Sequence, residues 1–328
     1  MSIKDHTVVC TDDNIDEIRS RYPDGLTFVA GDTHGEVASL QALMQKIKFE
    51  PSKDRVFFVG DYNGGGNVQC LLDYISLYYE ADYSRPGFHL IRGNHERELS
   101  PIYTLGNQPD IVVLKKEHMT YYVAHAGMVA EAFELINKDI SNNPDKSLFV
   151  YKLDDICVQY DAPLRQLMWS RNGLYSQKSP RHVWPSQEKL SQNKACIIHG
   201  HSPYCFFIKD NYYSYGRNNL FWCNQRVFFS EDLQSFNVDS NIKGRYENGE
   251  GHRLLSCVCI EIIEEIAKEN NSHLSMSAVR NAPNFVFSTP HIYTYYTEYN
   301  GDIKRITSSL PEMKTISLDN INKPIIVN

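Results

Sequence analysis

Five short apolar runs in this sequence each end directly in Asp, Asn or His, and this feature constrains the fold more than any other. Runs of three or four apolar residues bounded by turn residues are typical of strands buried within a sheet. We therefore expect strands at Thr27–Ala30, Val56–Val59, His89–Ile91, Tyr121–Ala124 and Cys196–Ile198.

The residues that follow these strands are carboxylates, an amide and imidazoles. In open α/β sheets, ligands bind just beyond the carboxyl ends of the strands, so the endings predict one shared rim. Oxygen and imidazole groups gathered in this way are able to bind a metal ion. The endings are Gly31-Asp32-Thr33-His34-Gly35, Gly60-Asp61, Arg92-Gly93-Asn94-His95-Glu96, His125-Ala126-Gly127 and His199-Gly200-His201.

Helical spacing of apolar residues separates the first three strands. From residue 26 to about 92 this alternation predicts right-handed crossovers and a parallel sheet. Aromatic and β-branched runs between 204 and 298 predict a second, largely antiparallel sheet, and 130–170 is expected to be mainly helical. The favoured architecture is an α/β sandwich of two mixed β-sheets flanked by helices. The apolar residues at helical spacing are Leu40, Leu43, Met44 and Ile47, and then Val68, Leu71, Leu72 and Ile75.

Composition divides the chain into three parts. Residues 1–25 form an acidic lead-in with one expected helix near Asp13–Arg21, residues 26–300 form one large domain, and residues 301–328 form a polar tail. With 42% apolar residues the chain is able to bury a sizeable core.

Charge and cysteine usage limit the partners and the compartment. The net charge of −7 argues against a nucleic-acid partner, which would favour a basic surface. Eight cysteines without a C-x-x-C pair, several of them inside apolar runs, favour a reducing compartment. The polar N-terminal residues do not resemble a signal peptide, and no apolar window is long enough for a membrane span. We therefore expect a soluble cytoplasmic protein.

Each strand ending has a simpler explanation when it is taken alone. Asp32 and Asp61 are suited to cap the helices that follow them. A single buried histidine such as His125 or His201 is more often a hydrogen-bonded structural residue than a ligand. Asn94 and its neighbouring histidine have no packing use after a strand, and the recurrence at five strand ends favours a metal site.

The motifs resemble those of the calcineurin-like metallophosphoesterase superfamily and, within it, the phosphoprotein phosphatase family. The resemblance covers roughly 26–262 and includes Gly200-His201-Ser202-Pro203, Trp169-Ser170-Arg171 and Asn237-Val238-Asp239-Ser240. The His-Ala-Gly and Gly-His-Ser-Pro sequences are similar to the bacterial-type branch. The resemblance implies the calcineurin-like sandwich fold, with the catalytic domain at 26–300.

The resemblance also implies two divalent metal ions bridged by one carboxylate. A ligand set of oxygen and imidazole without thiolate favours manganese, with iron or zinc as alternatives. His199 is an alternative to His201, but the Gly-His match favours His201. By motif position the ligands of the first ion are Asp32, His34 and Asp61, and those of the second are Asp61, Asn94, His125 and His201.

A dinuclear centre of this kind has a direct hydrolytic chemistry. Two cations about 3.5–4 Å apart clamp a phosphoryl group and lower the pKa of a shared water. The shared hydroxide would attack phosphorus in line with the leaving oxygen, without a phosphoenzyme intermediate. His95, beside a ligand but not itself one, is the candidate general acid. Arg92 and Arg171 are candidate phosphate-binding residues because the guanidinium fork binds phosphate oxygens in a bidentate way.

The chain departs from the family just after its second motif, where Gly64-Gly65-Gly66 stands in place of Asp-Arg-Gly. Gly64 replaces the carboxylate that would pair with the general acid. Its loss predicts a less stabilised His95 imidazolium, unless Glu96 or another carboxylate substitutes. Gly65 replaces a phosphate-binding arginine, which predicts extra space that would admit phosphotyrosine. The glycine run lacks the Lys-Ser/Thr ending of a nucleotide-binding P-loop.

The leading interpretation is a metal-dependent protein phosphatase that acts on phosphoserine, phosphothreonine and, through the wider mouth, phosphotyrosine of a phosphorylated protein substrate. A second interpretation is a dinucleoside polyphosphate hydrolase, which the bacterial-type motifs resemble in places. A third is a catalytically impaired phosphate-binding scaffold, which the missing Asp-Arg suggests. The retained ligand set argues against the scaffold.

Overall fold

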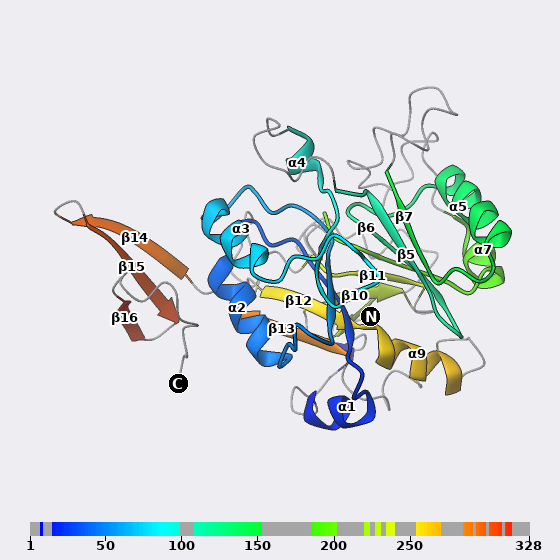
Figure 1. The fold of residues 1–328 in the computed structure, drawn as a ribbon, viewed down its shortest axis with the longest axis horizontal. Helices are drawn as coiled ribbons and strands as arrows, with labels where there is room; N and C mark the ends of the chain where they lie inside the picture. The colour runs from blue at the N-terminus through cyan, green and yellow to red at the C-terminus, as the bar shows by residue number, and fades with distance from the viewer. Residues whose placement is uncertain are drawn as a thin grey trace.

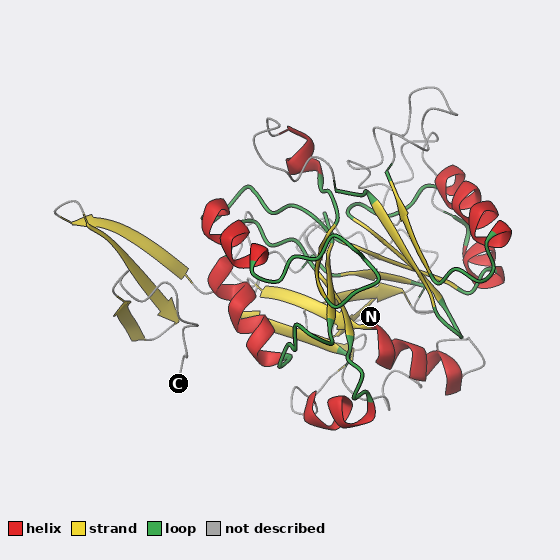
Figure 2. Cartoon of the chain, in the orientation of Figure 1, coloured by secondary structure: helices red, strands yellow, loops and turns green. Residues whose placement is uncertain are grey.

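Two large mixed sheets and a smaller three-stranded sheet make up the architecture of the chain (Figure 1). Helices lie along the outside of the large sheets (Figure 2). The computed structural model describes residues 7–8, 15–98, 108–152, 185–201, 220–223, 227–230, 234–239, 254–269, 285–290, 293–299, 302–309 and 312–316.

The first large sheet has five strands in the order β13-β12-β2-β3-β4. Strands β2, β3 and β4 are parallel, as the strand–helix alternation predicts, and β12 runs antiparallel to β2 and β13. The bounds are β2 (Thr27–Ala30), β3 (Arg55–Phe58), β4 (Gly87–Leu90), β12 (Leu254–Cys259) and β13 (Val286–Pro290).

Two helices form the crossovers of this sheet and confirm the helical spacing. Helix α2 (Val37–Lys46) connects β2 to β3, and α3 (Val68–Ser76) connects β3 to β4. The residues Leu40 and Leu43 of α2 and Leu71 of α3 are fully buried, because the apolar stripe faces the sheet. These connections bring the carboxyl ends of β2, β3 and β4 to one edge.

The second large sheet has eight strands in the order β1-β9-β10-β11-β8-β6-β5-β7. The neighbouring strands β6, β8 and β11 are parallel, so their carboxyl ends also share one edge. The bounds are β1 (Thr7–Val8), β5 (Ile111–Lys115), β6 (Thr120–Ala124), β7 (Leu148–Tyr151), β8 (Ala195–His199), β9 (Leu220–Cys223), β10 (Val227–Ser230) and β11 (Ser235–Asn237).

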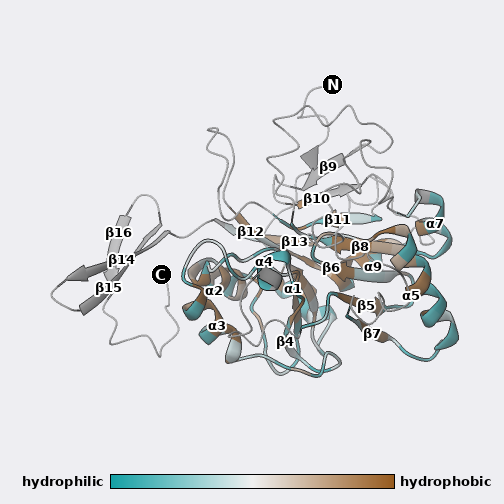
Figure 3. Cartoon of the chain, turned by 90° about the horizontal axis from the view of Figure 1, so that it is seen from above, coloured by the Kyte–Doolittle hydropathy of each residue, from teal (hydrophilic) through white to brown (hydrophobic). Residues whose placement is uncertain are grey.

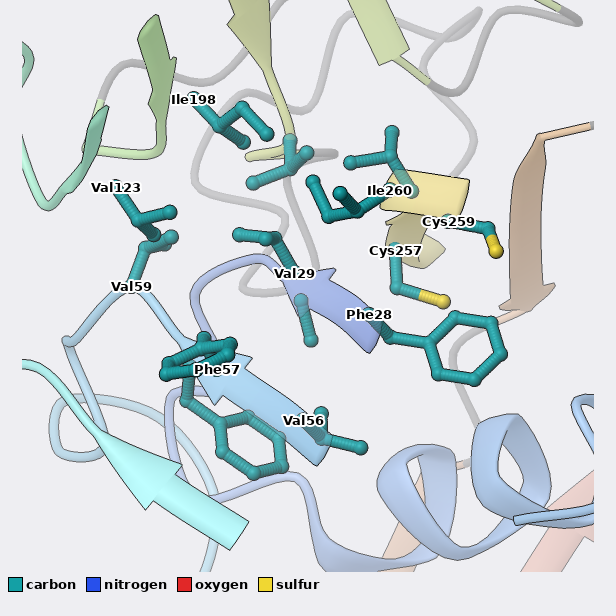
Figure 4. Close-up of a cluster of buried hydrophobic side chains, with 14 of the residues drawn as sticks. Phe28, Val29, Val56, Phe57, Val59, Val123, Ile198, Cys257, Cys259 and Ile260 are labelled. Atoms are coloured by element: carbon teal, nitrogen blue, oxygen red, sulfur yellow. The ribbon is translucent and has the colours of Figure 1, made fainter. Parts of the chain in front are cut away.

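Alternating side chains along the strands of this sheet pack into two different hydrophobic clusters. On β6, Tyr121 and Val123 join the core between the sheets, whereas Tyr122 and Ala124 join a second cluster beneath helix α5 (Ala130–Asn142). Figure 4 shows Val123 and Ile198 of this sheet in one cluster with side chains of β2, β3 and β12.

Hydropathy separates the strands from the outer helices. Hydrophobic residues gather on the strands, while the helices alternate between hydrophobic and hydrophilic faces (Figure 3). The second cluster also takes Leu190 of α7 (Gln187–Gln192), so α5 and α7 cover the outer face of the eight-stranded sheet. None of the helices in the described part of the chain combines the length and apolar character needed to cross a bilayer.

The region between 204 and 298 differs from the expected single antiparallel sheet. Its strands are distributed over all three sheets, and β11 pairs with β8 in parallel. The apolar run from 254 to 262 changes from strand to helix at Ile260, where α9 (Ile260–Glu269) begins. The expectation that 130–170 is mainly helical is also wrong in part, because β7 lies at Leu148–Tyr151.

The two ends of the chain contribute more structure than their polar composition indicates. Helix α1 (Ile15–Arg21) buries Ile18, and Arg19 forms an ion pair of 2.7 Å with the buried Asp54. Strands β14 (Tyr293–Tyr299), β15 (Asp302–Ser309) and β16 (Glu312–Ile316) form the three-stranded sheet. This sheet crosses the expected boundary at residue 300.

Candidate metal centre

The carboxyl ends of the parallel strands in the two large sheets meet at one place. After β6 and β8, the Gly200 N–H donates to the His125 carbonyl at 2.7 Å. The His201 N–H then donates to Oδ2 of Asp32, which follows β2 in the other sheet, at 2.9 Å. A direct hydrogen bond therefore joins the strand ends of both sheets.

Two groups of potential ligand atoms lie at this junction. Within each group the ligand atoms lie within 4.8 Å of one another, and all the residues are buried. Asp61 belongs to both groups, so its carboxylate lies between them. The groups are Asp32, His34 and Asp61, and then Asp61, His125 and His201.

The second group is organised around Nε2 of His125. This atom lies 2.8 Å from Oδ1 of Asn94, 3.3 Å from Oδ1 of Asp61 and 3.1 Å from Nδ1 of His201. The structure therefore brings together all four residues that motif position assigns to the second ion. His199 is not part of either group among the described residues.

Backbone carbonyls orient two of the imidazoles. Nδ1 of His125 lies 3.0 Å from the Val59 carbonyl, and Nδ1 of His34 lies 2.8 Å from the Asn63 carbonyl. A proton on each Nδ1 satisfies these carbonyls and leaves each Nε2 as a lone-pair donor toward the site. Burial lowers the pKa of His125 to about 3, which keeps this ring neutral as a metal ligand must be.

Backbone strain is concentrated at the same residues. His34, Asp61 and His201 have φ values of 47°, 53° and 67°, in the left-handed region that residues with a side chain rarely adopt. Such conformations persist where surrounding contacts hold them, and they cluster at functional sites.

Two glycines allow the strand ends to approach this closely. A β-carbon at Gly93 would collide with the backbone nitrogen and the carboxylate of Asp61. A β-carbon at Gly200 would collide with Oδ1 of Asp32. Any larger residue at these positions would displace a carboxylate of the site.

The candidate general acid His95 lies at the edge of the group. Its backbone N–H donates to Oδ1 of Asp61 at 3.2 Å, and its Nε2 lies 3.7 Å from Oδ2 of the same carboxylate. The ring meets His34 edge to face, with centroids 5.7 Å apart. About a quarter of its side chain is exposed, so a bound ligand is able to reach it (23%).

Glu96, one of the carboxylates considered as a substitute for the missing partner of His95, makes other contacts. Both of its oxygens accept backbone N–H groups, at Asp61, Tyr62 and Gly93. Burial and the charge of Asp61 raise the pKa of Glu96 to about 7, while the three N–H donors favour its ionised form.

Of the two candidate phosphate-binding arginines, the structure describes only Arg92. Arg92 is buried, and its Nε and Nη2 form a bidentate pair with Asp110 at 2.9 and 2.7 Å. This pair offsets much of its charge. Arg171 lies outside the described residues, as do Trp169, Ser170 and the Ser202-Pro203 part of the last motif.

The loop Gly64–Gly66 lies against His34 and does not leave a gap there. The Gly66 N–H donates to the His34 carbonyl at 2.7 Å, and a β-carbon at Gly65 would lie 2.6 Å from that carbonyl oxygen. The inner side of the loop is therefore filled by backbone atoms. Gly65 and Gly66 are nevertheless exposed on their outer side.

Two buried carboxylates near the site were not assigned a role from the sequence. Glu96 contacts the backbone of both neighbouring turns, and Asp239, only 4% exposed, lies close to Asp32. Burial, and then the charges of Asp239 and Asp61, raise the pKa of Asp32 well above its usual value. The sequence signal for Asp239 is its position in Asn237-Val238-Asp239-Ser240, two residues after the end of β11.

The residues fit a dinuclear metal centre. Oδ1 of Asp32 is buried and has no hydrogen-bond partner among the described residues, so a ligand is required to satisfy it. The carboxylate of Asp32 lies near those of Asp239 and Asp61, and bound cations would offset the repulsion between these negative charges. The donors are oxygen and imidazole nitrogen, which suit divalent ions such as manganese, iron or zinc.

Comparison with known proteins agrees with this reading of the site. Residues 26–252 match the calcineurin-like phosphoesterase family model. The chain belongs to the calcineurin-like phosphoesterase family.

Relatives with named activities match smaller parts of the chain or match it weakly. A symmetrical bis(5'-nucleosyl)-tetraphosphatase of Chromohalobacter salexigens is 36% identical over 75 residues, which are 22% of this chain and 25% of that protein. The same enzyme of Actinobacillus succinogenes is 32% identical over 75 residues with the same coverage. The matched segment thus spans about a quarter of these relatives.

Two solved structures are similar to this chain at low sequence identity. A serine/threonine phosphatase of Saccharomyces cerevisiae has a TM-score of 0.43 and 18% identity, covering 74% of both chains. The cold-active protein-tyrosine phosphatase of a Shewanella species has a TM-score of 0.41 and 19% identity, covering 72% of this chain and 77% of that one.

Proposed function

We propose that this member of the calcineurin-like phosphoesterase family is a metal-dependent protein phosphatase. The observation that carries the proposal is the position of the Asp61 carboxylate, which belongs to both groups of ligand atoms. A carboxylate shared by two groups is what a dinuclear phosphoester hydrolase requires, because both cations must contact one phosphoryl group.

The ligand roles follow from the geometry of the two groups. Asp32, His34 and Asp61 would hold the first ion. Asp61 with Asn94, His125 and His201 would hold the second, and we propose manganese for both. Bound there, the ions would supply Lewis acidity to the phosphoryl group and to water.

His95 is the proposed general acid. Its Nε2 faces the shared carboxylate at 3.7 Å, and its partly exposed ring is able to reach the leaving oxygen of a bound phosphoester. His95 would give the proton on Nε2 to the leaving alkoxide and so prevent an unfavourable alkoxide product.

Arginine contacts to phosphate remain part of the proposal. Asp110 holds the guanidinium of Arg92 in one orientation but offsets its charge. We therefore assign the main cationic contact to Arg171 and a supporting one to Arg92. A phosphorylated protein fits the exposed glycine rim at Gly65 and Gly66, which presents no side chain to an incoming protein surface.

Hydrolysis of dinucleoside polyphosphates is the second candidate function. It is favoured by the similarity of a 75-residue segment to the two tetraphosphatases, whose names state activity on such substrates. Its chemistry would use the same ligands, so only the substrate separates the two candidates. A phosphate-binding scaffold would keep the ligands without turnover.

Turnover on a matched set of substrates distinguishes these candidates. Purified protein with manganese would be assayed on phosphoserine, phosphothreonine and phosphotyrosine peptides, on p-nitrophenyl phosphate and on diadenosine tetraphosphate, with a chelator-treated sample as the blank. We expect metal-dependent release of phosphate from peptides at the highest kcat/KM. A higher kcat/KM on diadenosine tetraphosphate would favour the second candidate, and no turnover on any substrate would leave the scaffold.

The peptide set also tests the phosphotyrosine hypothesis. The glycine rim lacks the arginine that would narrow the mouth, so we expect phosphotyrosine peptides to be hydrolysed at rates comparable to phosphoserine peptides. Rates on phosphotyrosine far below those on phosphoserine would contradict this part of the proposal.

A further inference from the structure

The carboxylate of Glu96 is buried among backbone N–H groups beside the candidate metal centre. Oε2 accepts from the N–H of Gly93 at 2.8 Å and of Asp61 at 2.9 Å, and Oε1 accepts from the N–H of Tyr62 at 2.8 Å. Only 3% of the residue is exposed.

Hydrogen bonds from these three N–H groups offset the cost of burying the Glu96 carboxylate. In the part of the chain that the structure describes, no lysine, arginine or histidine forms an ion pair with Glu96. A buried carboxylate without a cation is stable only when hydrogen bonds satisfy its oxygens. The arrangement is therefore specific to a group with two acceptor oxygens.

The bonds to Glu96 begin where the sheet ladder stops. Strands β3 and β4 pair up to Phe58 and Leu90, and the Ile91 N–H makes the last backbone bond to the Phe58 carbonyl at 3.0 Å. Asp61 lies three residues beyond Phe58. Beyond the ladder, Oε2 of Glu96 joins the turn after β3 to the turn after β4.

The position of Glu96 in its helix explains how it reaches both turns. It is the third residue of the one-turn helix α4 (Asn94–Glu98), and its bond to the Gly93 N–H is the one that an N3 glutamate makes in a capping box. The same side chain then extends to the neighbouring strand end.

Glu96 also helps to fix the backbone conformation of Asp61, together with the His34 N–H, which donates to the Asp61 carbonyl at 2.8 Å. The N–H groups of Asp61 and Tyr62 belong to the two peptide planes on either side of the Asp61 Cα. Fixing both planes fixes φ and ψ of Asp61, whose φ of 53° is strained for a residue with a side chain. The direction of the Asp61 carboxylate depends on these two angles.

We propose that Glu96 is a positioning residue that aims the Asp61 carboxylate at both metal ions and keeps it in register with Asn94. The inference rests on the metal centre of the proposed function. Glu96 would support metal binding indirectly, by holding the backbone of Asp61, and it would contact neither the metal nor the substrate.

Glu96→Gln is the direct test, because an amide has one acceptor oxygen and would place its NH₂ against a backbone N–H. Metal-free wild type, Glu96→Gln and the control Glu117→Gln, whose side chain is largely exposed, would be titrated with Mn²⁺ by calorimetry. We expect two ions in wild type and control, and about 10–100-fold weaker binding of at least one ion in Glu96→Gln.

Kinetics separate a positioning role from a loss of stability. At saturating Mn²⁺ we expect Glu96→Gln to lower kcat on p-nitrophenyl phosphate while KM stays within about twofold. Wild-type affinity for both ions in Glu96→Gln would overturn the inference, whatever its thermal stability. If wild type binds two ions and Glu96→Gln binds them weakly, but neither hydrolyses any phosphoester, the proposed function fails and the role of Glu96 stands.

Hydrogen exchange of the wild type keeps the inference testable if Glu96→Gln does not fold. The amides of Asp61, Tyr62 and Gly93 should be protected in the metal-free protein, because Glu96 holds them without help from the ions. Exchange of these amides at the rate of an open loop would overturn the proposal.

Discussion

The ligand-bearing turns and the glycine loop Gly64–Gly66 lie next to each other at the same sheet edge, yet they are built in opposite ways. The turns bury the side chains of all six candidate metal ligands, and β-carbons at Gly93 and Gly200 would collide with carboxylates of the site. The loop is tied to the same place by the Gly66 N–H bond to His34 but exposes its outer side and presents no side chain.

The difference teaches which part of the site the fold itself determines. Positions of the ligands depend on close backbone packing at the ends of β2, β3, β6 and β8, which has few solutions. Contacts to a substrate depend on side chains of exposed segments, which a chain is able to change without losing its core. The turns with the candidate ligands are thus the part of the site that backbone packing holds in place, and the glycine loop is its exposed part.

The largest effect is expected from Asp61→Asn, which removes the charge shared by both groups of ligand atoms. Loss of several kcal/mol of charge stabilisation corresponds to a decrease in kcat/KM of about a thousandfold or more. Calorimetry should show fewer bound Mn²⁺ ions at the same time. Asp24→Asn, at an exposed position, is the matched control. Full activity of Asp61→Asn would remove the basis for a shared carboxylate.

His95→Asn tests a side chain at the border between the two regions. We expect retained Mn²⁺ binding and a decrease in kcat of about 100-fold on phosphoserine peptides, because the general acid is lost. The decrease should be much smaller on p-nitrophenyl phosphate, whose leaving group needs no proton. Equal decreases on both substrates would contradict the role of general acid and would assign the His95 side chain to positioning of Asp61, whose Oδ2 lies 3.7 Å from its Nε2.

The same contrast explains what the sequence could predict. The proximity of Asp32, His34 and Asp61 was predictable, because parallel strands bring their carboxyl ends to one edge of the sheet. Residues that directly follow such strands therefore lie close together in space. Gly65 was harder to interpret, because its lack of a side chain predicted an opening, and only the structure shows that its inner side packs against the His34 carbonyl. Whether a glycine leaves a gap depends on the path of the chain.

Partner choice within the site was also hidden from the sequence. Glu96 was considered a possible partner for His95, but its distance to the two turns determines that it binds their amides instead. Arg92 likewise looked available for phosphate until Asp110, which lies 18 residues later, was found beside it. Such pairings depend on tertiary contacts between segments that no local pattern encodes.

A smaller effect on turnover is expected from Asp110→Asn, which tests whether Arg92 belongs to the rigid region. Removing one partner of a buried ion pair costs about 3–5 kcal/mol, so the free energy of unfolding should fall by roughly that amount in urea titration. An Arg92 released from Asp110 would change KM for phosphopeptides by no more than about tenfold. Asp145→Asn on the exposed turn after α5 is the control. An unchanged free energy of unfolding would mean that the ion pair between Arg92 and Asp110 does not stabilise the fold.

The smallest effect is expected from restoring the family sequence with Gly64→Asp and Gly65→Arg together. Gly64 has a φ of 112°, which disfavours a side chain, and the Gly65 β-carbon would lie 2.6 Å from the His34 carbonyl oxygen. We therefore expect a loss of stability of about 1–3 kcal/mol and no gain in kcat/KM. Single variants at each glycine would show which contact is responsible. A stable double variant with raised kcat/KM would contradict this expectation. It would mean that the backbone of the loop accepts the side chains that the family has at these positions.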